Sequence, residues 1–114
     1  MLQSLITKQC NECYYCKVQM TIKDSTKFKP TDATTEHLID KWSSPKHQKI
    51  ESEDNLVAAC FQCNNTRGSI RNTIARRYYQ EIINKYGIKA KAANISSKKL
   101  YKKFGPVPQE LLKL

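Results

Sequence analysis

The sequence lacks any hydrophobic run that approaches the ~20 apolar residues required by a membrane-spanning helix. Its first eight residues, MLQSLITK, lack the basic start and the long apolar stretch of a signal peptide. We therefore expect a cytoplasmic, intracellular protein with no membrane partner. Only 39% of the 114 residues are hydrophobic, so the core is small and a bound metal or partner would help the chain to fold. The length is typical of a single domain.

Acidic residues are scarce in the second half of the chain. The whole sequence holds 20 Lys and Arg against 10 Asp and Glu, which gives a net charge of +10. Residues 65–114 carry twelve basic side chains but only Glu81 and Glu110, whereas residues 1–64 are balanced. This excess favours a polyanionic partner, usually nucleic acid, over a merely solvated lysine-rich surface.

The five cysteines do not suit a set of disulfides, because their number is odd and no signal peptide precedes them. Two C-x-x-C pairs instead predict a tetrahedral structural zinc site, since each short gap lets a turn direct two thiolates at one ion. Cys10 and Cys13 form a competing pair. We prefer Cys13 with Cys16, because the aromatic residues between them and the following Lys17 suit a turn, and Cys10 is then a bystander thiol. The predicted zinc ligands are Cys13, Cys16, Cys60 and Cys63.

The 43 residues between the two cysteine pairs exceed the ~15–20 of a simple zinc ribbon, so the contents of this insert decide the function. A strand is predicted over residues 33–39, and a second strand over residues 55–59 runs directly into Cys60. Trp42 lies between them and either packs the loop or touches a substrate, while we interpret His47 as a surface residue.

An amphipathic helix is predicted beyond the second cysteine pair, because apolar residues recur at every fourth position until Gly87 ends the pattern. This spacing assigns Tyr78 and Tyr86 to the core and leaves Tyr79 open. The recurring residues are Ile70, Ile74, Tyr78, Ile82 and Tyr86.

Residues 88–114 are predicted to form a basic helical extension. Ser96 or Ser97 can cap a short helix that reaches Phe104, and Pro108 can open a last turn. The apolar residues of this extension are expected to fold back onto the zinc module. Candidate phosphate contacts, which would give affinity without sequence preference, are Arg71, Arg76, Arg77, Lys98, Lys99, Lys102 and Lys103.

The order of these pieces resembles the HNH endonuclease family, which has a ββα-metal (His-Me finger) fold. The resemblance covers roughly residues 10–70. No single piece of it is specific, whereas all of the pieces together, in this order, are. The matching pieces are Cys13-x-x-Cys16, Glu36-His37, Asn55-Leu56-Val57 and Cys60-x-x-Cys63-Asn64-x-x-Arg67-Gly68. The implied fold class is α+β, a small ββα-metal module over about residues 10–87 that is held together by the four-cysteine zinc site and followed by C-terminal helices.

The resemblance also implies a role for each matching residue. His37 matches the general base and Glu36 an acidic metal ligand, while Asn55 matches the Asn that braces the loop and orients the His. Asn64 matches the second metal ligand, although the adjacent Asn65 takes that role if the helix start shifts by one residue. Arg67 matches a basic residue near the phosphate.

The chemistry of these side chains agrees with the implied roles. A neutral imidazole can accept a proton from water near neutrality, and the oxygen atoms of Glu36 and Asn64 suit Mg²⁺ or Mn²⁺. Because neighbouring residues in a strand point to opposite faces, Glu36 and His37 can share a site only where the strand ends. Asp40 departs from the family, which often has Pro there, and is either a harmless loop change or a further acidic group near the metal.

The resulting expectation is a metal-dependent DNA endonuclease that hydrolyses phosphodiester bonds with low sequence specificity. The main alternative is a non-catalytic, zinc-stabilised module that binds nucleic acid or acts as an adaptor. A third is a nuclease that is active only within a larger nucleoprotein or packaging complex. The co-occurrence of Glu36, His37, Asn55 and Asn64 favours the enzyme, because binding alone does not require them.

Overall fold

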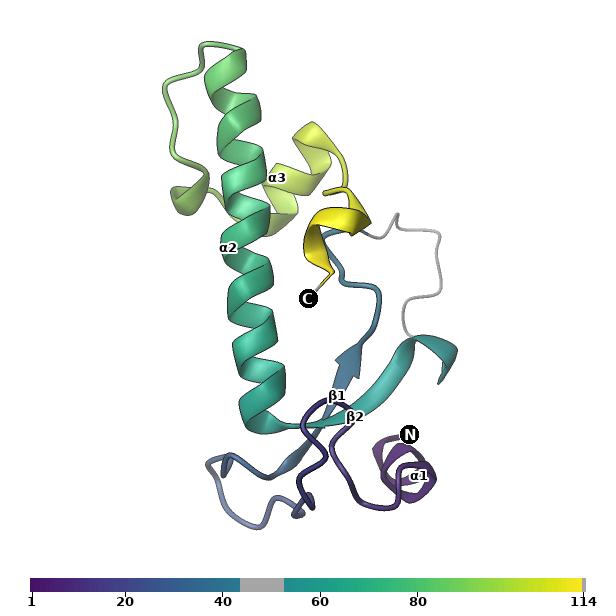
Figure 1. The fold of residues 1–114 in the computed structure, drawn as a ribbon. Helices are drawn as coiled ribbons and strands as arrows, with labels where there is room; N and C mark the ends of the chain where they lie inside the picture. The colour runs from purple at the N-terminus through teal and green to yellow at the C-terminus, as the bar shows by residue number, and fades with distance from the viewer. Residues whose placement is uncertain (44–52, 114) are drawn as a thin grey trace. The chain divides into compact units, whose positions relative to one another are not determined.

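The structure is a computed structural model that describes residues 1–43 and 53–113. Within these residues it is a small α+β fold, with one two-stranded sheet, three α-helices and short 3₁₀ turns (Figure 1). Two units are distinguished among the described residues, and each is treated by itself below. The first unit comprises residues 1–38 and 53–68, and the second comprises residues 39–43 and 69–113.

The sheet of the first unit is an antiparallel hairpin of β1 (Ala33–His37) and β2 (Leu56–Cys60). Ala33 pairs with Cys60 at one end and His37 pairs with Leu56 at the other. Both strands were predicted, but β1 ends two residues earlier than expected. A 3₁₀ turn (Glu53–Asn55) precedes β2. Asn55 is its last residue, and the backbone carbonyl of Asn55 accepts the Leu38 N–H at 2.8 Å.

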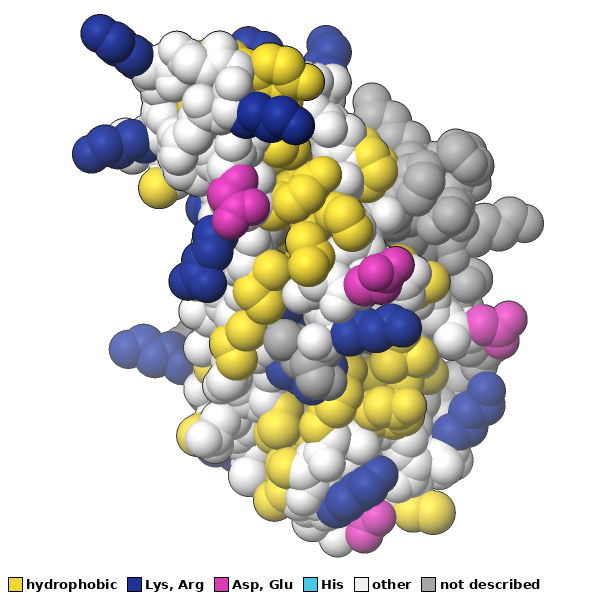
Figure 2. All heavy atoms as spheres, turned by 45° about the horizontal axis from the view of Figure 1, so that its top comes forward, with side chains coloured by type: hydrophobic (Ala, Val, Ile, Leu, Met, Phe, Trp, Pro, Cys, Tyr) yellow, Lys and Arg dark blue, Asp and Glu magenta, His cyan; other side chains and the backbone are white. Residues whose placement is uncertain are grey.

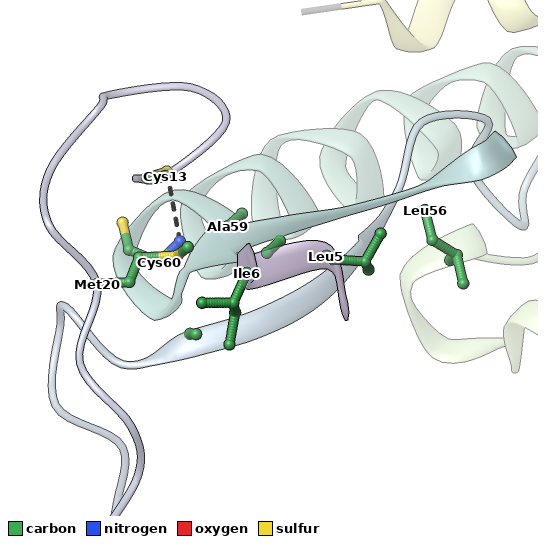
Figure 3. Close-up of a cluster of buried hydrophobic side chains, with 9 residues drawn as sticks. Leu5, Ile6, Cys13, Met20, Leu56, Ala59 and Cys60 are labelled. Atoms are coloured by element: carbon green, nitrogen blue, oxygen red, sulfur yellow. Dashed lines mark hydrogen bonds between the residues drawn. The ribbon is translucent and has the colours of Figure 1, made fainter. Parts of the chain in front are cut away.

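The first unit also has a short N-terminal helix, α1 (Leu2–Lys8), which the sequence analysis did not predict. Leu5 and Ile6 are buried against both strands, and Figure 3 shows them among the side chains of the hairpin. Gln9 follows α1 and pairs with the backbone of Ala58, donating to its carbonyl and accepting from its N–H, both at 2.8 Å. Gln9 thus satisfies the backbone of β2 on the side away from β1.

Helix α2 (Phe61–Lys85) begins directly after β2, nine residues before the predicted apolar pattern starts at Ile70. The predicted stop is confirmed, because Gly87 has a φ of 67° and donates its N–H to the carbonyl of Asn84. The N–H of Ile88 reaches the carbonyl of Ile83, so the helix ends in a Schellman motif.

The predicted phase of this helix is wrong by one residue. Tyr79 is fully buried, whereas Tyr86 is 70% exposed and Tyr78 is only half-buried. Tyr86 lies beyond the last residue of α2, where helical periodicity no longer determines which way a side chain points. The neighbours that surround Tyr79 come from before the helix, as Trp42 does, and from after it, as Leu100 and Phe104 do, and periodicity alone does not reveal them. The buried line on α2 is Arg71, Ala75, Tyr79 and Ile83.

The second unit is built around Tyr79. Its hydroxyl donates to the carbonyl of Gly105 at 2.6 Å, and its ring lies 5.9 Å from that of Trp42 and 6.2 Å from that of Phe104. Trp42 therefore packs the loop after β1, which settles the choice left open by the sequence. Its carbonyl also accepts the N–H of Val107 at 2.8 Å.

The C-terminal extension forms the elements that the sequence predicted. Helix α3 (Ser97–Phe104) is capped by Ser96, whose hydroxyl accepts the Lys99 N–H at 3.3 Å. A 3₁₀ turn (Gln109–Leu112) follows Pro108. The apolar residues of the extension pack on α2, where Leu100, Phe104 and Leu112 join the cluster around Tyr79. Leu111 is 46% exposed.

Candidate metal centre and its neighbours

The predicted cysteines come together in the first unit. The sulfur atoms of Cys13, Cys16, Cys60 and Cys63 all lie within 4.8 Å of one another. Cys60 ends β2 and Cys63 lies in the first turn of α2, while the other two frame a loop between α1 and β1. The preference for Cys16 over Cys10 is confirmed, because Cys16 belongs to this cluster and Cys10 lies outside it.

The geometry of the cluster suits zinc. A tetrahedral site with Zn–S bonds of ~2.3 Å has sulfur–sulfur edges of ~3.8 Å. The Cys16 and Cys60 sulfur atoms lie 3.8 Å apart. Backbone N–H groups also point at the sulfur atoms, with Cys60 donating to the Cys13 Sγ at 3.4 Å and Cys63 to the Cys60 Sγ at 3.5 Å. Four thiolates so placed could hold a structural zinc ion.

Cys13 differs in acidity from Cys60 and Cys63. Burial raises the pKa of Cys13, but hydrogen bonds from the backbone of Cys60, Cys16 and Tyr15 outweigh that effect and lower its pKa to about 6. Burial is also the largest influence on Cys60 and Cys63, and it raises the pKa of both thiols. Cys13 is therefore mostly thiolate near neutrality, while Cys60 and Cys63 must lose protons before they bind a metal.

A second group of polar residues lies where α2 meets β1. The side-chain amide of Asn64 donates to the Thr34 hydroxyl at 2.8 Å and to the Thr35 carbonyl at 3.2 Å. One turn further along α2, the Nε atom of Arg67 lies 3.6 Å from the Oε2 atom of Glu36. Thr34 and Glu36 are two residues apart in β1 and so share one face of the strand. The helix therefore brings Asn64 and Arg67 to the face of β1 that carries Glu36.

Arg67 has a further contact with the cysteine-bearing loop. Its guanidinium carbon lies 3.7 Å from the centroid of the Tyr15 ring, which is a close cation–π arrangement. Tyr15 stands between Cys13 and Cys16 in the sequence. Sequence reasoning placed Arg67 near a phosphate and missed Tyr15, although the aromatic residues between the two cysteines were the available signal.

His37 is the last residue of β1 and is half-buried. The strand thus ends where a shared Glu36–His37 site requires it to end. Asn55 is buried, and its carbonyl accepts the N–H of Leu38, the residue after His37. Asn65, the alternative to Asn64, is exposed, and His47 lies outside the described residues.

Glu36 and Asn64 carry the type of donor atom, oxygen, that a catalytic divalent ion would require. Mg²⁺ and Mn²⁺ accept one or two oxygen ligands from the protein and keep several waters, and Glu36 and Asn64 supply such oxygens. However, Glu36 is only 3% exposed, and Arg67 is a cation in contact with it here. Within the described part of the chain, the four cysteines are the only group of three or more His, Cys, Asp or Glu residues placed to hold a metal.

Two of the predicted phosphate contacts are engaged inside the second unit. Arg71 is buried, and its Nη1 atom lies 3.7 Å from a carboxylate oxygen of Asp40. Arg76 donates to the carbonyls of Ala92 and Ile95 at 2.6 and 2.7 Å. The sequence could not reveal this, because both sets of partners are set by tertiary structure. Asp40 here pairs with an arginine and accepts the Trp42 N–H at 2.8 Å.

The remaining basic candidates are exposed. Figure 2 shows lysine and arginine side chains projecting from the surface in this view, with fewer acidic side chains among them. The exposed candidates are Arg77, Lys98, Lys99, Lys102 and Lys103. These five side chains are available to a polyanion as the structure stands.

Asp32 is a buried polar residue that the sequence analysis missed. Its carboxylate accepts the Thr21 hydroxyl at 2.6 Å and the Lys29 N–H at 2.8 Å, and these bonds hold its pKa below the usual value. Its backbone carbonyl accepts the N–H of Phe61 at 2.8 Å, at the start of α2. Asp32 therefore fixes the loop before β1 and the entry to α2, both of which border the cysteine cluster.

None of the described helices is long and apolar enough to cross a membrane. Comparisons of the chain with family models, with curated proteins and with solved structures found no match.

Proposed function

We propose that this protein is an HNH-type, metal-dependent DNA endonuclease with a structural zinc site and a ββα-metal core. The observation that carries the proposal is the arrangement of one hairpin and the helix that follows it. Glu36 and His37 stand at the end of β1, Asn55 precedes β2, and Asn64 lies in the first turn of α2. Such a grouping beside the four cysteines supports a nuclease more strongly than any one of these residues does.

In the proposed reaction, the imidazole of His37 accepts a proton from a water molecule that attacks the phosphorus in line. The new P–O bond forms as the bond to the 3′ oxygen breaks, which leaves a 5′-phosphate and a 3′-hydroxyl after the leaving oxygen gains a proton from solvent. Glu36 and Asn64 would hold a divalent ion that neutralises charge on the phosphate and the leaving oxygen. The backbone carbonyl of Asn55 accepts the N–H of Leu38 and so supports the backbone just beyond His37.

The exposed lysines of α3 extend the proposal to the partner. Phosphate contacts from lysine give affinity that depends on salt but carries little sequence preference. Lys98, Lys99, Lys102 and Lys103 are all exposed on α3, and Leu100 anchors that helix in the core. Weakly sequence-specific binding to DNA is the behaviour that such a surface supports.

The test is a supercoiled-plasmid assay with Mg²⁺, Mn²⁺ or EDTA. His37→Ala is expected to lower the cleavage rate by about 10²–10⁴-fold, the usual contribution of a general base. Zinc content and DNA binding should stay at the wild-type level. The matched control is His47→Ala, which removes the chain's other histidine and should cleave normally. Unchanged cleavage by His37→Ala would refute the mechanism.

One observation favours a second candidate, a zinc-stabilised nucleic-acid-binding or adaptor module. Glu36 is buried and paired with Arg67, as expected for a carboxylate with a purely structural role. That module would bind DNA in a salt-dependent way and would not cleave it, whichever metal is added. A nuclease subunit of a larger complex would behave likewise alone but gain activity, lost in His37→Ala, when its partners are added.

A further inference from the structure

The ion pair between Arg67 and Glu36 is more buried than a surface pair. The Glu36 side chain is 3% exposed and that of Arg67 is 19% exposed, and their Oε2 and Nε atoms lie 3.6 Å apart. A buried carboxylate requires a nearby positive charge or several hydrogen-bond donors to stay ionised. Arg67 supplies that charge within the first unit.

The guanidinium of Arg67 is also held from the side of the cysteine cluster. Its central carbon lies 3.7 Å from the Tyr15 ring centroid, so the group is placed between an aromatic face and a carboxylate. Tyr15 belongs to the loop that Cys13 and Cys16 attach to the metal centre. The position of Arg67 therefore depends on the loop that carries two zinc ligands.

Arg67 has space to move away from Glu36. Together with Tyr15 it lines a hollow of about 520 Å³ in the first unit, which also borders the metal centre through Cys16, Cys60 and Cys63. A guanidinium that leaves the carboxylate can enter this hollow and remain over the tyrosine ring. A divalent ion on Glu36 would repel the Arg67 cation beside the same carboxylate, so the charge of Arg67 weakens the binding of that ion.

We propose that Arg67 is a positioning residue that holds Glu36 in the absence of a divalent ion and releases it when that ion binds. This inference rests on the proposed function, because it takes Glu36 as a ligand of the catalytic ion. It makes the occupancy of the site a competition between one cation of the chain and one from solution. Tyr15 sets the strength of that competition by keeping the guanidinium close to β1.

The test measures Mn²⁺ binding rather than cleavage, with the zinc-loaded full-length protein and no nucleic acid. Free Mn²⁺ is followed by electron paramagnetic resonance during a titration. Arg67→Gln removes the competing charge and is expected to bind Mn²⁺ about tenfold more tightly than the wild type, as one lost repulsive contact of moderate strength allows. Arg77→Gln is the matched control, since it removes an exposed arginine from the same helix and should leave the affinity unchanged.

Glu36→Gln identifies the ligand and should abolish binding in the same titration. If Glu36→Gln abolishes binding but Arg67→Gln binds as the wild type does, the competition is refuted and the proposed catalytic ion remains. If neither the wild type nor Arg67→Gln binds Mn²⁺, both the inference and the proposed metal site fail.

A second pair of variants keeps the test decisive if Arg67→Gln does not fold. Tyr15→Leu removes the aromatic support and leaves the charge in place, so it should tighten Mn²⁺ binding by a smaller factor, about two- to fivefold. Tyr86→Leu is the control, because Tyr86 is 70% exposed and belongs to the second unit, whereas Tyr15 is the ring that contacts Arg67. Equal affinities in these two variants would overturn the role of Tyr15.

Discussion

Removal of one zinc ligand should destabilise the first unit far more than removal of the bystander thiol. Cys60→Ser changes the residue that joins β2 to α2 and whose sulfur lies 3.8 Å from that of Cys16. Cys10→Ser makes the same chemical change at an exposed cysteine outside the cluster. The two variants therefore separate loss of metal from loss of a sulfur atom.

The expected magnitude follows from the small core around the cluster. Three of its buried residues are alanines, Ala33, Ala58 and Ala59, which bury little apolar surface. Structural zinc sites contribute about 10–16 kcal/mol of apparent binding free energy, while whole domains are stable by about 5–15 kcal/mol. A loss of even 3 kcal/mol shifts Tm by roughly 12–24 °C in a domain of this size. We expect the Tm of Cys60→Ser to fall by at least that amount, and the Tm of Cys10→Ser to fall by less than about 4 °C.

Thermal unfolding followed by circular dichroism, with and without a chelator, is the measurement, and zinc is assayed on the same samples. Zinc affinity should also rise steeply with pH near neutrality. Since the pKa of Cys60 and that of Cys63 are both raised by burial, at least two protons must leave when the metal binds. A wild type that contains no zinc, or a Cys10→Ser protein that loses as much stability as Cys60→Ser, would refute the reasoning.

Two further predictions concern the second unit. Tyr79→Phe should lower the free energy of unfolding in urea by about 1–3 kcal/mol, because the carbonyl of Gly105 loses its donor, while Tyr86→Phe should change it by less than about 0.5 kcal/mol. Burial raises the pKa of Tyr79 from 10.0 to about 12, so the folded protein favours the neutral phenol. The free energy of unfolding should therefore be constant below pH 10 and fall between pH 10 and pH 12. Tyr79→Phe should lack this fall. Replacing the α3 lysines with Gln should weaken the salt dependence of DNA affinity, measured by fluorescence anisotropy. The slope of log affinity against log salt concentration should become less steep by up to ~0.9 per lysine, and an unchanged slope would show that these lysines do not contact DNA. The residues replaced are Lys98, Lys99, Lys102 and Lys103.

The parts of the fold that the sequence predicted are those specified by neighbouring residues. The two C-x-x-C spacings bring four sulfur atoms to one place, because each pair is closed by its own turn. Helix α3 is capped by Ser96 and ends at Gly105, whose φ of 84° suits glycine. The hairpin follows from two β-branched or apolar runs that lead into Cys60. In each case, residues within a few positions of one another carry the signal.

The features that the sequence could not predict depend on residues far apart in the chain. Tyr78 and Tyr79 both lie on the apolar side of α2, and only the packing of α3 and Trp42 determines which ring is buried. Arg76 is a basic residue on a helix, and nothing near it in the sequence indicates that its guanidinium bonds the carbonyls of Ala92 and Ile95. Charge alone therefore does not distinguish a basic side chain that is bonded within the protein from one that is exposed.

The register of the hairpin separates the proposed chemistry from the metal centre. Ala33 pairs with Cys60 at the zinc end, and His37 pairs with Leu56 at the other end. Four residues of strand span about 13 Å, so a structural zinc ion is too far away to act on a phosphate beside His37. In the proposed mechanism, a zinc ion would therefore influence hydrolysis only through the fold and through the contact between Tyr15 and Arg67. A cysteine substitution should accordingly reduce stability and cleavage together, whereas His37→Ala should reduce cleavage alone.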